Sequence, residues 1–234
     1  MKQVLVALAV LATLLVLTDL YLALLWSPPE AEMGDLVRIM YFHVASAWVA
    51  FLAFTVTFVC SLLYFWRRNA VIDLIALSST EISLVYTTIT LVTGSLWARP
   101  VWNTWWTWDP RLTTTLILWF LLIGLLLLRG TVTGAERRAR FSAVFAIVAF
   151  VDVPIIHLSV TLWRSIHPQV ITDTGFQMPG SMVITLLFSF LAFMVIYALL
   201  LLLRVQAGLL EIRIQKLRGH IRDVTRVMEG EVQG

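Results

Sequence analysis

Six long apolar runs constrain the fold of this 234-residue chain more than any other feature of its sequence. A transmembrane helix needs roughly 20 apolar residues to cross about 30 Å of hydrocarbon. Six runs reach this length: residues 4–26, 39–66, 71–97, 112–129, 141–163 and 181–203. Charged residues make up only 13% of the chain, whereas a soluble domain carries roughly 25%. We therefore predict an all-α, polytopic integral membrane bundle of six transmembrane helices.

The first run has an alternative interpretation as a secretory signal peptide, because Lys2 precedes it. The run is longer than a signal core, contains Asp19 and lacks a good small-residue cleavage site after it. We expect it to be retained as a helix. Residues 1–204 then form one membrane domain, and residues 205–234 form a cytoplasmic tail.

The basic residues predict the orientation of the bundle, because Lys and Arg accumulate in the connections that stay in the cytoplasm. Thirteen of the 17 lie on the side of the termini. The other four are Arg38, Arg99, Arg111 and Arg164. We predict a multi-pass protein with both termini cytoplasmic and three outward-facing connections: residues 27–38, 98–111 and 164–180.

Charge and cysteine content exclude several kinds of site. The basic residues lie in short segments between apolar runs rather than in a patch with interleaved aromatic residues, so we expect membrane lipid and no nucleic acid as a partner. Cys60 is the single cysteine, which excludes internal disulfides, a Cys-x-x-Cys redox pair and a Cys-x-x-Cys-His motif.

The connection between the third and fourth runs, residues 97–112, holds half of the ten tryptophans: Trp97, Trp102, Trp105, Trp106 and Trp108. A belt of Trp at a membrane surface usually places one or two rings at each helix end. The higher density here indicates a binding surface for a flat apolar ligand. The spacing of Trp102, Trp105, Trp106 and Asp109 predicts one face of a short helix that lies along the outer membrane surface.

Two histidines lie in apolar runs near the same outer boundary. His43 is about four residues, or roughly 6 Å, below the start of the second helix, and His157 is about seven residues, or roughly 10 Å, below the end of the fifth. Pro154 predicts a kink that turns His157 toward a cavity. Neutral imidazole is a good ligand for haem iron, although a single intramembrane His can also be hydrogen-bonded inside the bundle. We predict His43 and His157 as metal ligands, and His167 and His220 as solvated residues.

The charged residues of the outer face each have two interpretations. Haem propionates are natural anionic partners for its four basic residues, Arg38, Arg99, Arg111 and Arg164. The alternative is that these side chains extend toward lipid headgroups. Asp109 either belongs to the ligand platform or caps the fourth helix, because Asp is favoured at the N-cap and Pro at the first helical position.

Three acidic residues, Asp19, Glu81 and Asp152, lie within apolar runs, where an unpaired carboxylate is costly. Three roles are open for these residues: to line a translocation path, to orient a histidine through a hydrogen bond, or to join helices. For Asp19 we favour the joining of helices.

The tail contains a heptad pattern of apolar residues. Its a and d positions are Leu203, Ala207, Leu210, Ile214, Leu217, Ile221, Val224 and Met228. This pattern predicts that the sixth helix continues into the cytoplasm with an apolar seam that binds a partner or a second copy. A helix that lies on the membrane surface is the alternative.

Three segments resemble a known family. Trp102-Asn-Thr-Trp105-Trp106-Thr-Trp108-Asp109-Pro-Arg111-Leu112-Thr113 is similar to the tryptophan-rich WWD signature of the haem-handling proteins of cytochrome c maturation. Tyr41-Phe-His43-Val and Pro154-Ile-Ile-His157-Leu-Ser-Val are similar to the two histidine segments of its short, six-helix group, cytochrome c maturation protein C or haem exporter protein C. The resemblance covers roughly residues 35–200, and Asn103 stands where it leads us to expect Gly.

The resemblance implies that His43 and His157 are axial ligands of haem b, which is carried as cargo. It also implies a haem platform that meets a periplasmic haem chaperone, made of Trp102, Trp105, Trp106, Trp108 and Asp109. The other implied partners are an ABC-type membrane subunit, its ATPase and a small single-helix membrane subunit, in the inner membrane of a bacterium. This chain has no Gly-rich phosphate-binding loop of its own.

We therefore expect a protein without enzymatic activity that binds haem b at the extracytoplasmic face of the membrane and presents it to the chaperone. The alternatives are a haem-translocating channel within an ABC transporter complex and a purely structural subunit of such a complex.

Overall fold

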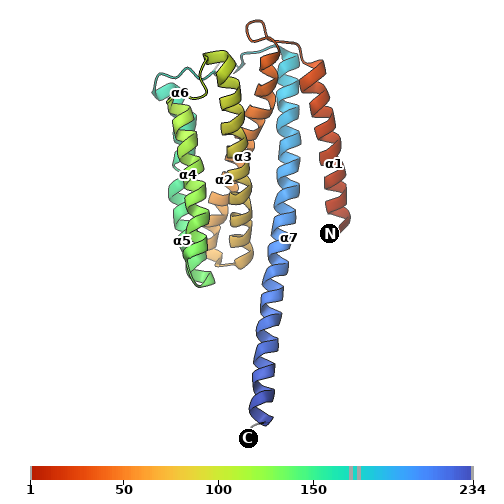
Figure 1. Cartoon of the computed structure of the whole chain (residues 1–234), viewed down its shortest axis with the longest axis vertical. Helices are drawn as coiled ribbons and strands as arrows, with labels where there is room; N and C mark the ends of the chain where they lie inside the picture. The colour runs from red at the N-terminus through yellow and green to blue at the C-terminus, as the bar shows by residue number, and fades with distance from the viewer. Residues whose placement is uncertain (1, 169–170, 173–174, 233–234) are drawn as a thin grey trace.

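In a computed structural model the chain forms a bundle of long helices that stand side by side, as Figure 1 shows. The structure describes residues 2–168, 171–172 and 175–232. Within these residues, six helical segments are long and apolar enough to cross a membrane. The prediction of an all-α membrane bundle with six spans is confirmed.

The elements follow one another as α1 (Lys2–Tyr21), a π-helical turn (Leu22–Trp26), a 3-10 turn (Asp35–Val37), α2 (Arg38–Arg67), α3 (Ala70–Trp102), α4 (Pro110–Thr131), α5 (Ala135–Ala149), α6 (Asp152–Leu162), the strands β1 (Ile171–Thr172) and β2 (Gly175–Phe176), and α7 (Gly180–Val232). The two short strands pair antiparallel, with Ile171 opposite Phe176. We call the end of the bundle that carries residues 97–112 and 163–168 the aromatic end. The end where α1 begins and α7 leaves the bundle is the terminal end (Figure 1).

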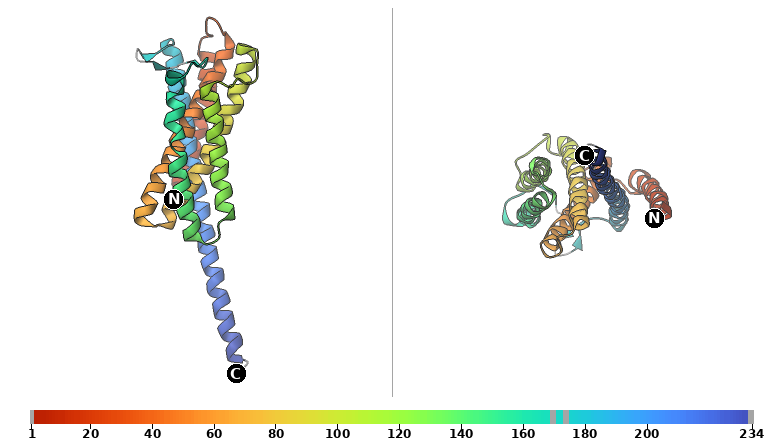
Figure 2. Two further views of the ribbon diagram at one scale, coloured as in Figure 1. Left: turned by 90° about the vertical axis from the view of Figure 1, so that its left-hand side faces the viewer. Right: turned by 90° about the horizontal axis from the view of Figure 1, so that it is seen from below.

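The centre of the bundle is the pair α2 and α3. Small polar residues on α3 allow the two backbones to approach closely, since Ser79 Oγ donates to Ala53 O at 2.7 Å and Ser83 Oγ donates to Ala50 O at 2.9 Å. Helices α4, α5 and α6 pack on one side of this pair and α7 on the other, with α1 outermost against α7 (Figure 2). The central pair therefore holds both halves of the bundle together.

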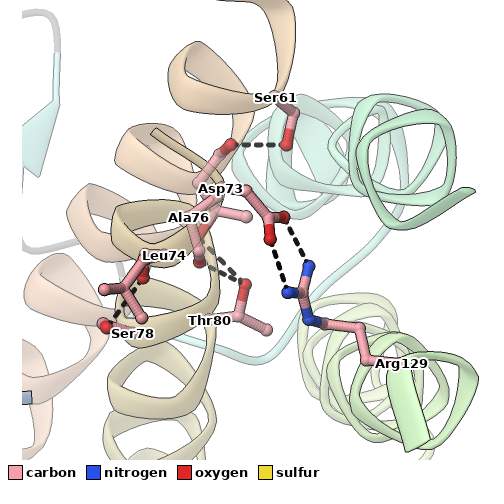
Figure 3. Close-up of polar contacts among 8 residues, drawn as sticks. Ser61, Asp73, Leu74, Ala76, Ser78, Thr80 and Arg129 are labelled. Carbon is pink, nitrogen blue, oxygen red and sulfur yellow. Dashed lines mark hydrogen bonds and ion pairs between the residues drawn. The ribbon is translucent and has the colours of Figure 1, made fainter. Parts of the chain in front are cut away.

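An ion pair joins α3 to α4 near the terminal end. Arg129 donates from both terminal nitrogens to the Asp73 carboxylate, at 2.6 and 2.8 Å. Figure 3 shows this pair beside the polar side chains of α3, where Thr80 donates to the carbonyl of Ala76. Both charged side chains are largely buried, so the loss of one would leave the other uncompensated. The pair thus fixes the register of α4 on α3.

The predicted short surface helix within residues 97–112 is not formed. Helix α3 continues to Trp102 and ends at Asn103, which has the left-handed φ of 55° that usually favours Gly. Asn is the common substitute for Gly at such a helix end, so Asn103 preserves the turn. Helix α4 begins at Pro110, capped by Asp109, so residues 103–109 are too few for a helix between two sharp ends and form an irregular loop.

The helix break that Pro154 predicts is present. Helix α5 ends at Ala149 and α6 begins at Asp152. Pro154 has no N–H to donate to the carbonyl of Phe150, which accepts instead from Val153 N at 3.1 Å. The break separates α6, at the aromatic end, from α5.

Candidate functional site

A cavity of about 570 Å³ opens at the aromatic end, lined by residues of α2, α3, α4, α6 and the loop after α6. Small-molecule sites usually have volumes of about 300–1,000 Å³. Most of the lining is apolar. Its distinctive polar and aromatic members are His43, His157, His167, Arg111, Trp97, Trp102 and Trp106.

His43 lies in the second turn of α2, and only 8% of its surface is exposed. Its Nδ1 is 3.1 Å from Thr93 Oγ1 on α3. The Thr93 hydroxyl donates its single hydrogen to Ile89 O at 2.7 Å, so it accepts a hydrogen bond from Nδ1 of His43. The hydrogen therefore sits on Nδ1, and Nε2 keeps a free lone pair for a ligand bond.

Gly94 provides the space for the His43 ring. A Cβ atom at position 94 would lie 2.9 Å from Cε1 of His43, closer than real Cβ contacts allow. One turn further along α3, the ring of Trp97 stands edge-on to the imidazole, with 6.0 Å between the ring centroids. Three residues of α3 therefore position the His43 ring: Thr93 through a hydrogen bond, Gly94 by leaving space for the ring, and Trp97 by edge-on packing.

His167 belongs to the loop after α6, and its ring centroid lies 6.4 Å from that of His43. Its Nδ1 is 3.0 Å from Pro168 O, a carbonyl that can only accept, so Nδ1 donates and Nε2 is free. Burial, together with the Arg111 guanidinium, lowers the pKa of His167 below its ordinary value. The neutral imidazole, which is the form that binds metal, is thereby favoured.

The sequence predicted His167 to be a solvated residue, whereas the structure places it in the lining of the cavity. The loop is held over the cavity by Asp109, whose Oδ2 accepts from Ile166 N at 2.9 Å. These two segments are 57 residues apart, so no local pattern in the sequence signals the contact. The other predicted ligand, His157, lies on α6 with an exposed side chain and also lines the cavity.

Asp109 is a positioning residue at the junction of two segments. It is buried, with 7% of its surface exposed, and it does not line the cavity. Its Oδ1 accepts from Arg111 N at 2.9 Å and caps α4, while Oδ2 holds the loop of His167. Asp109 therefore caps α4, as one interpretation of the sequence predicts, and also holds the loop that carries His167.

The five tryptophans divide into two groups. Trp97, Trp102 and Trp106 line the cavity, and the indole N–H groups of Trp97 and Trp106 are buried without a hydrogen-bond partner among the described residues. Trp105 and Trp108 are 57% and 76% exposed on the surface of the loop. Trp108 stands edge-on to Trp106, with 6.0 Å between the ring centroids. The loop thus presents indole rings both inward and outward.

Of the four arginines predicted for the site, Arg111 lines the cavity. Its Nε is buried and has no hydrogen-bond partner within the described part of the chain, and its Nη2 lies 3.5 Å from His157 O. Arg38 instead bonds Asp35 and Ala23 O, Arg99 bonds Asn103 and lies over the Trp105 ring, and Arg164 is exposed. Arg111 is therefore the cation of this group that a ligand in the cavity meets.

Comparison with known proteins agrees with the resemblance of the three segments. Residues 1–220 match the model of the family described as "Heme exporter protein C". The chain belongs to the haem exporter protein C family. It is 34% identical to the protein of that name from Bradyrhizobium diazoefficiens, over 92% of this chain and 82% of the relative. It is 32% identical to the one from Haemophilus influenzae, over 80% of this chain and 77% of the relative.

A relative from Marchantia polymorpha, described as a putative cytochrome c biosynthesis ccmC-like mitochondrial protein, is 32% identical over 74% of each chain. The match of the family model ends at residue 220, within α7. In this haem exporter protein C family member, the whole cavity thus lies within the matched region.

The acidic residues of the apolar runs lie away from the cavity lining of this family member. Asp19 accepts from Ser189 Oγ at 2.5 Å and joins α1 to α7. Glu81 pairs with Arg204 at 2.7 Å and joins α3 to α7. Asp152 is buried at the break before α6, and its Oδ2 has no hydrogen-bond partner in the described residues. Asp19 and Glu81 thus join helices.

Proposed function

We propose that this protein binds haem b non-covalently in the cavity at the aromatic end, as cargo, and presents it to an extracytoplasmic haem chaperone for cytochrome c maturation. The observation that carries the proposal is the pair His43 and His167. Their ring centroids are 6.4 Å apart and each donates Nδ1–H to an oxygen, which leaves both Nε2 atoms for a metal. Two imidazoles suit a metal whose other ligands come from a macrocycle.

The residues present fit a haem group. If His43 and His167 both held a haem iron through Nε2, at metal–nitrogen distances of roughly 2.0–2.1 Å, their ring centres would lie roughly 6 to 7 Å apart. Among the described residues no group of three or more His, Cys, Asp or Glu side chains could hold a bare metal ion. The apolar lining and three cavity tryptophans suit porphyrin faces, and Arg111 is positioned for a propionate.

The proposed ligand pair replaces one residue that the resemblance implied. His43 and His157 were the predicted pair, and both line the cavity with His167. We assign the second ligand to His167 because its tautomer and its separation from His43 both suit axial binding. His157 then contributes an imidazole to the rim and its carbonyl to Arg111.

The exposed tryptophans support the proposed presentation to a chaperone. Trp105 and Trp108 project from the loop that also supplies the cavity residue Trp106. Exposed aromatic rings are enriched at interfaces because they bury large apolar areas. The chaperone therefore docks on the outward indoles beside the haem edge.

The family name further supports an ABC-type exporter complex, with an ATPase, a membrane subunit and a small single-helix subunit as partners. We place the protein in the cytoplasmic (inner) membrane of a bacterium, with both termini in the cytoplasm and the aromatic end outside, as the basic residues favour. A translocation path along Glu81 is disfavoured, because its carboxylate is paired with Arg204.

The test of the proposed function is the absorption spectrum of the purified protein after haem loading. We expect one haem per chain and a six-coordinate, low-spin spectrum, with release of haem to the purified chaperone. Absence of stoichiometric binding, or a five-coordinate spectrum of the unmodified chain, would contradict the proposal.

Substitutions of Asp109 test its role in capping α4 separately from its role in positioning His167. An Asp109→Asn side chain has one acceptor oxygen, which can cap α4 at Arg111 N or hold Ile166 N, but not both. We expect the helix content and the thermal midpoint to change little, while a fraction of bound haem becomes high-spin as His167 loosens. Asp109→Ala, which loses both bonds, should destabilise the protein by about 1 kcal/mol through the lost cap. An unchanged low-spin spectrum for both variants would show that the tether of His167 is unimportant.

A further inference from the structure

Helix α7 continues unbroken from Gly180 to Val232 and projects far beyond the other helices at the terminal end (Figures 1 and 2). Gly208 is still in close contact with the bundle, since a Cβ there would lie 2.4 Å from Cδ1 of Leu74 near the start of α3. The C-terminal part of α7 stands clear of the other helices in both views. We call residues 209–222 the projecting segment.

An apolar stripe on this segment has no cover in the described structure. Leu210, Ile214, Leu217 and Ile221 are 56%, 48%, 62% and 62% exposed. They are spaced by four, three and four residues, so they share one face of the helix. A helix that lies on the membrane would have to turn away from the axis of α7, whereas α7 is one continuous helix from Gly180 to Val232. The stripe is therefore available to a partner in the water phase.

The residue types along the stripe favour one partner helix. In the heptad register, Ile214 and Ile221 occupy a positions, and Leu210 and Leu217 occupy d positions. β-Branched residues at a with Leu at d favour two-stranded, parallel coiled coils over higher assemblies. The register extends through the contact at Gly208 to Ala207 and Leu203, so the seam continues directly from the helix that the bundle anchors.

The flanking charges decide between a second copy and a different protein. In a parallel pair, each g residue faces the e residue of the following heptad on the other helix. Arg213 occupies a g position and Arg218 the following e position, so two copies would place Arg213 of each opposite Arg218 of the other. Like charges at these positions repel. Lys216 and Arg222 add to the positive charge of the segment, and its one acidic residue, Glu211, occupies the preceding e position, where two copies would place it opposite the uncharged Gln206.

We propose that the projecting segment docks a single parallel helix of another protein, with an apolar seam and acidic flanks. Glu or Asp at the e and g positions of this partner pairs with Arg218 and Arg213, which removes the repulsion that opposes a second copy. The bundle anchors the N-terminal end of the seam. A parallel partner helix therefore runs away from the terminal end of the bundle. This interaction is independent of the haem site.

Two designed peptides test the charge preference on the full-length protein in detergent. Both have three heptads with Ile at a and Leu at d, and they carry either Glu or Lys at every e and g position. We expect the Glu peptide to bind about ten-fold more tightly than the Lys peptide by fluorescence anisotropy, because it forms exposed ion pairs with Arg213 and Arg218 where the Lys peptide places like charges. The difference should shrink in 1 M salt. Equal affinity of the two peptides would overturn the proposal.

Two variants control this experiment. Arg213→Glu with Arg218→Glu should reverse the preference between the peptides, and Leu217→Asp should abolish binding of both. The substituted residues of both variants lie in the projecting segment, so the thermal midpoint and the haem spectrum should match those of the unmodified protein. Retention of the original preference after the charge reversal would contradict the assigned register.

A single-cysteine variant tests for a second copy. Cys60 is the only cysteine of the chain, so Cys60→Ser with Leu217→Cys places one thiol at a d position of the seam. Under mild oxidation we expect a mixed disulfide with a Glu peptide that carries Cys at d, and no covalent dimer of the protein. A covalent dimer as the main product would assign the seam to a second copy and overturn the proposal.

Discussion

His43→Ala and His167→Ala are each expected to convert bound haem from a six-coordinate, low-spin form to a five-coordinate, high-spin form. Each variant removes one of the two imidazoles whose ring centroids lie 6.4 Å apart. The conversion should be complete in the absorption spectrum, because the remaining histidine supplies only one axial bond.

His157→Ala is the matched control for these variants, since His157 lines the same cavity from α6. We expect it to keep the low-spin spectrum and to alter haem affinity only modestly. The opposite pattern, with loss of the low-spin form in His157→Ala and its retention in His167→Ala, would restore the ligand pair that the resemblance implied. Exogenous imidazole should recover six-coordination in whichever variant has lost a true ligand.

The spans of the bundle could be predicted from the sequence because the length of an apolar run is a local property. The break before α6 is equally local, since Pro154 removes one backbone donor whatever surrounds it. Both predictions agree with the structure. The position of His43 near the aromatic end of its span follows from the same reasoning.

The aromatic end was less predictable because long-range contacts determine it. The spacing of Trp102 and Trp106 suits a helix, but Asn103 adopts a left-handed conformation and ends α3 between them. The hydrogen bond from Ile166 N to Asp109 then folds a polar loop over the cavity and brings His167 to His43. A spacing rule describes one helix face, so it misses a histidine that a distant carboxylate positions.

Gly94→Ala is expected to lower haem affinity strongly without destabilising α3. A Cβ at this position would lie 2.9 Å from Cε1 of His43, so the imidazole must move and its hydrogen bond to Thr93 must lengthen. In a helix interior, Ala is about 0.5–1 kcal/mol more favourable than Gly, so the backbone itself gains from the change. Loss of function with an equal or higher thermal midpoint therefore identifies the clash with His43.

Three further variants make this prediction specific to the imidazole. Gly130→Ala adds the same methyl group to α4 where nothing lies within 4 Å of the new Cβ, so it should leave haem binding unchanged.

Thr93→Val removes the acceptor for Nδ1 of His43 without adding bulk near the ring. Because hydrogen-bond partners of metal-binding histidines contribute about 10- to 100-fold to affinity, Thr93→Val should weaken haem binding within that range and shift the reduction potential, and Thr93→Ser should recover both. If Gly94→Ala and Thr93→Val both bound haem as the unmodified protein does, His43 would have a structural role and the ligand assignment would fail.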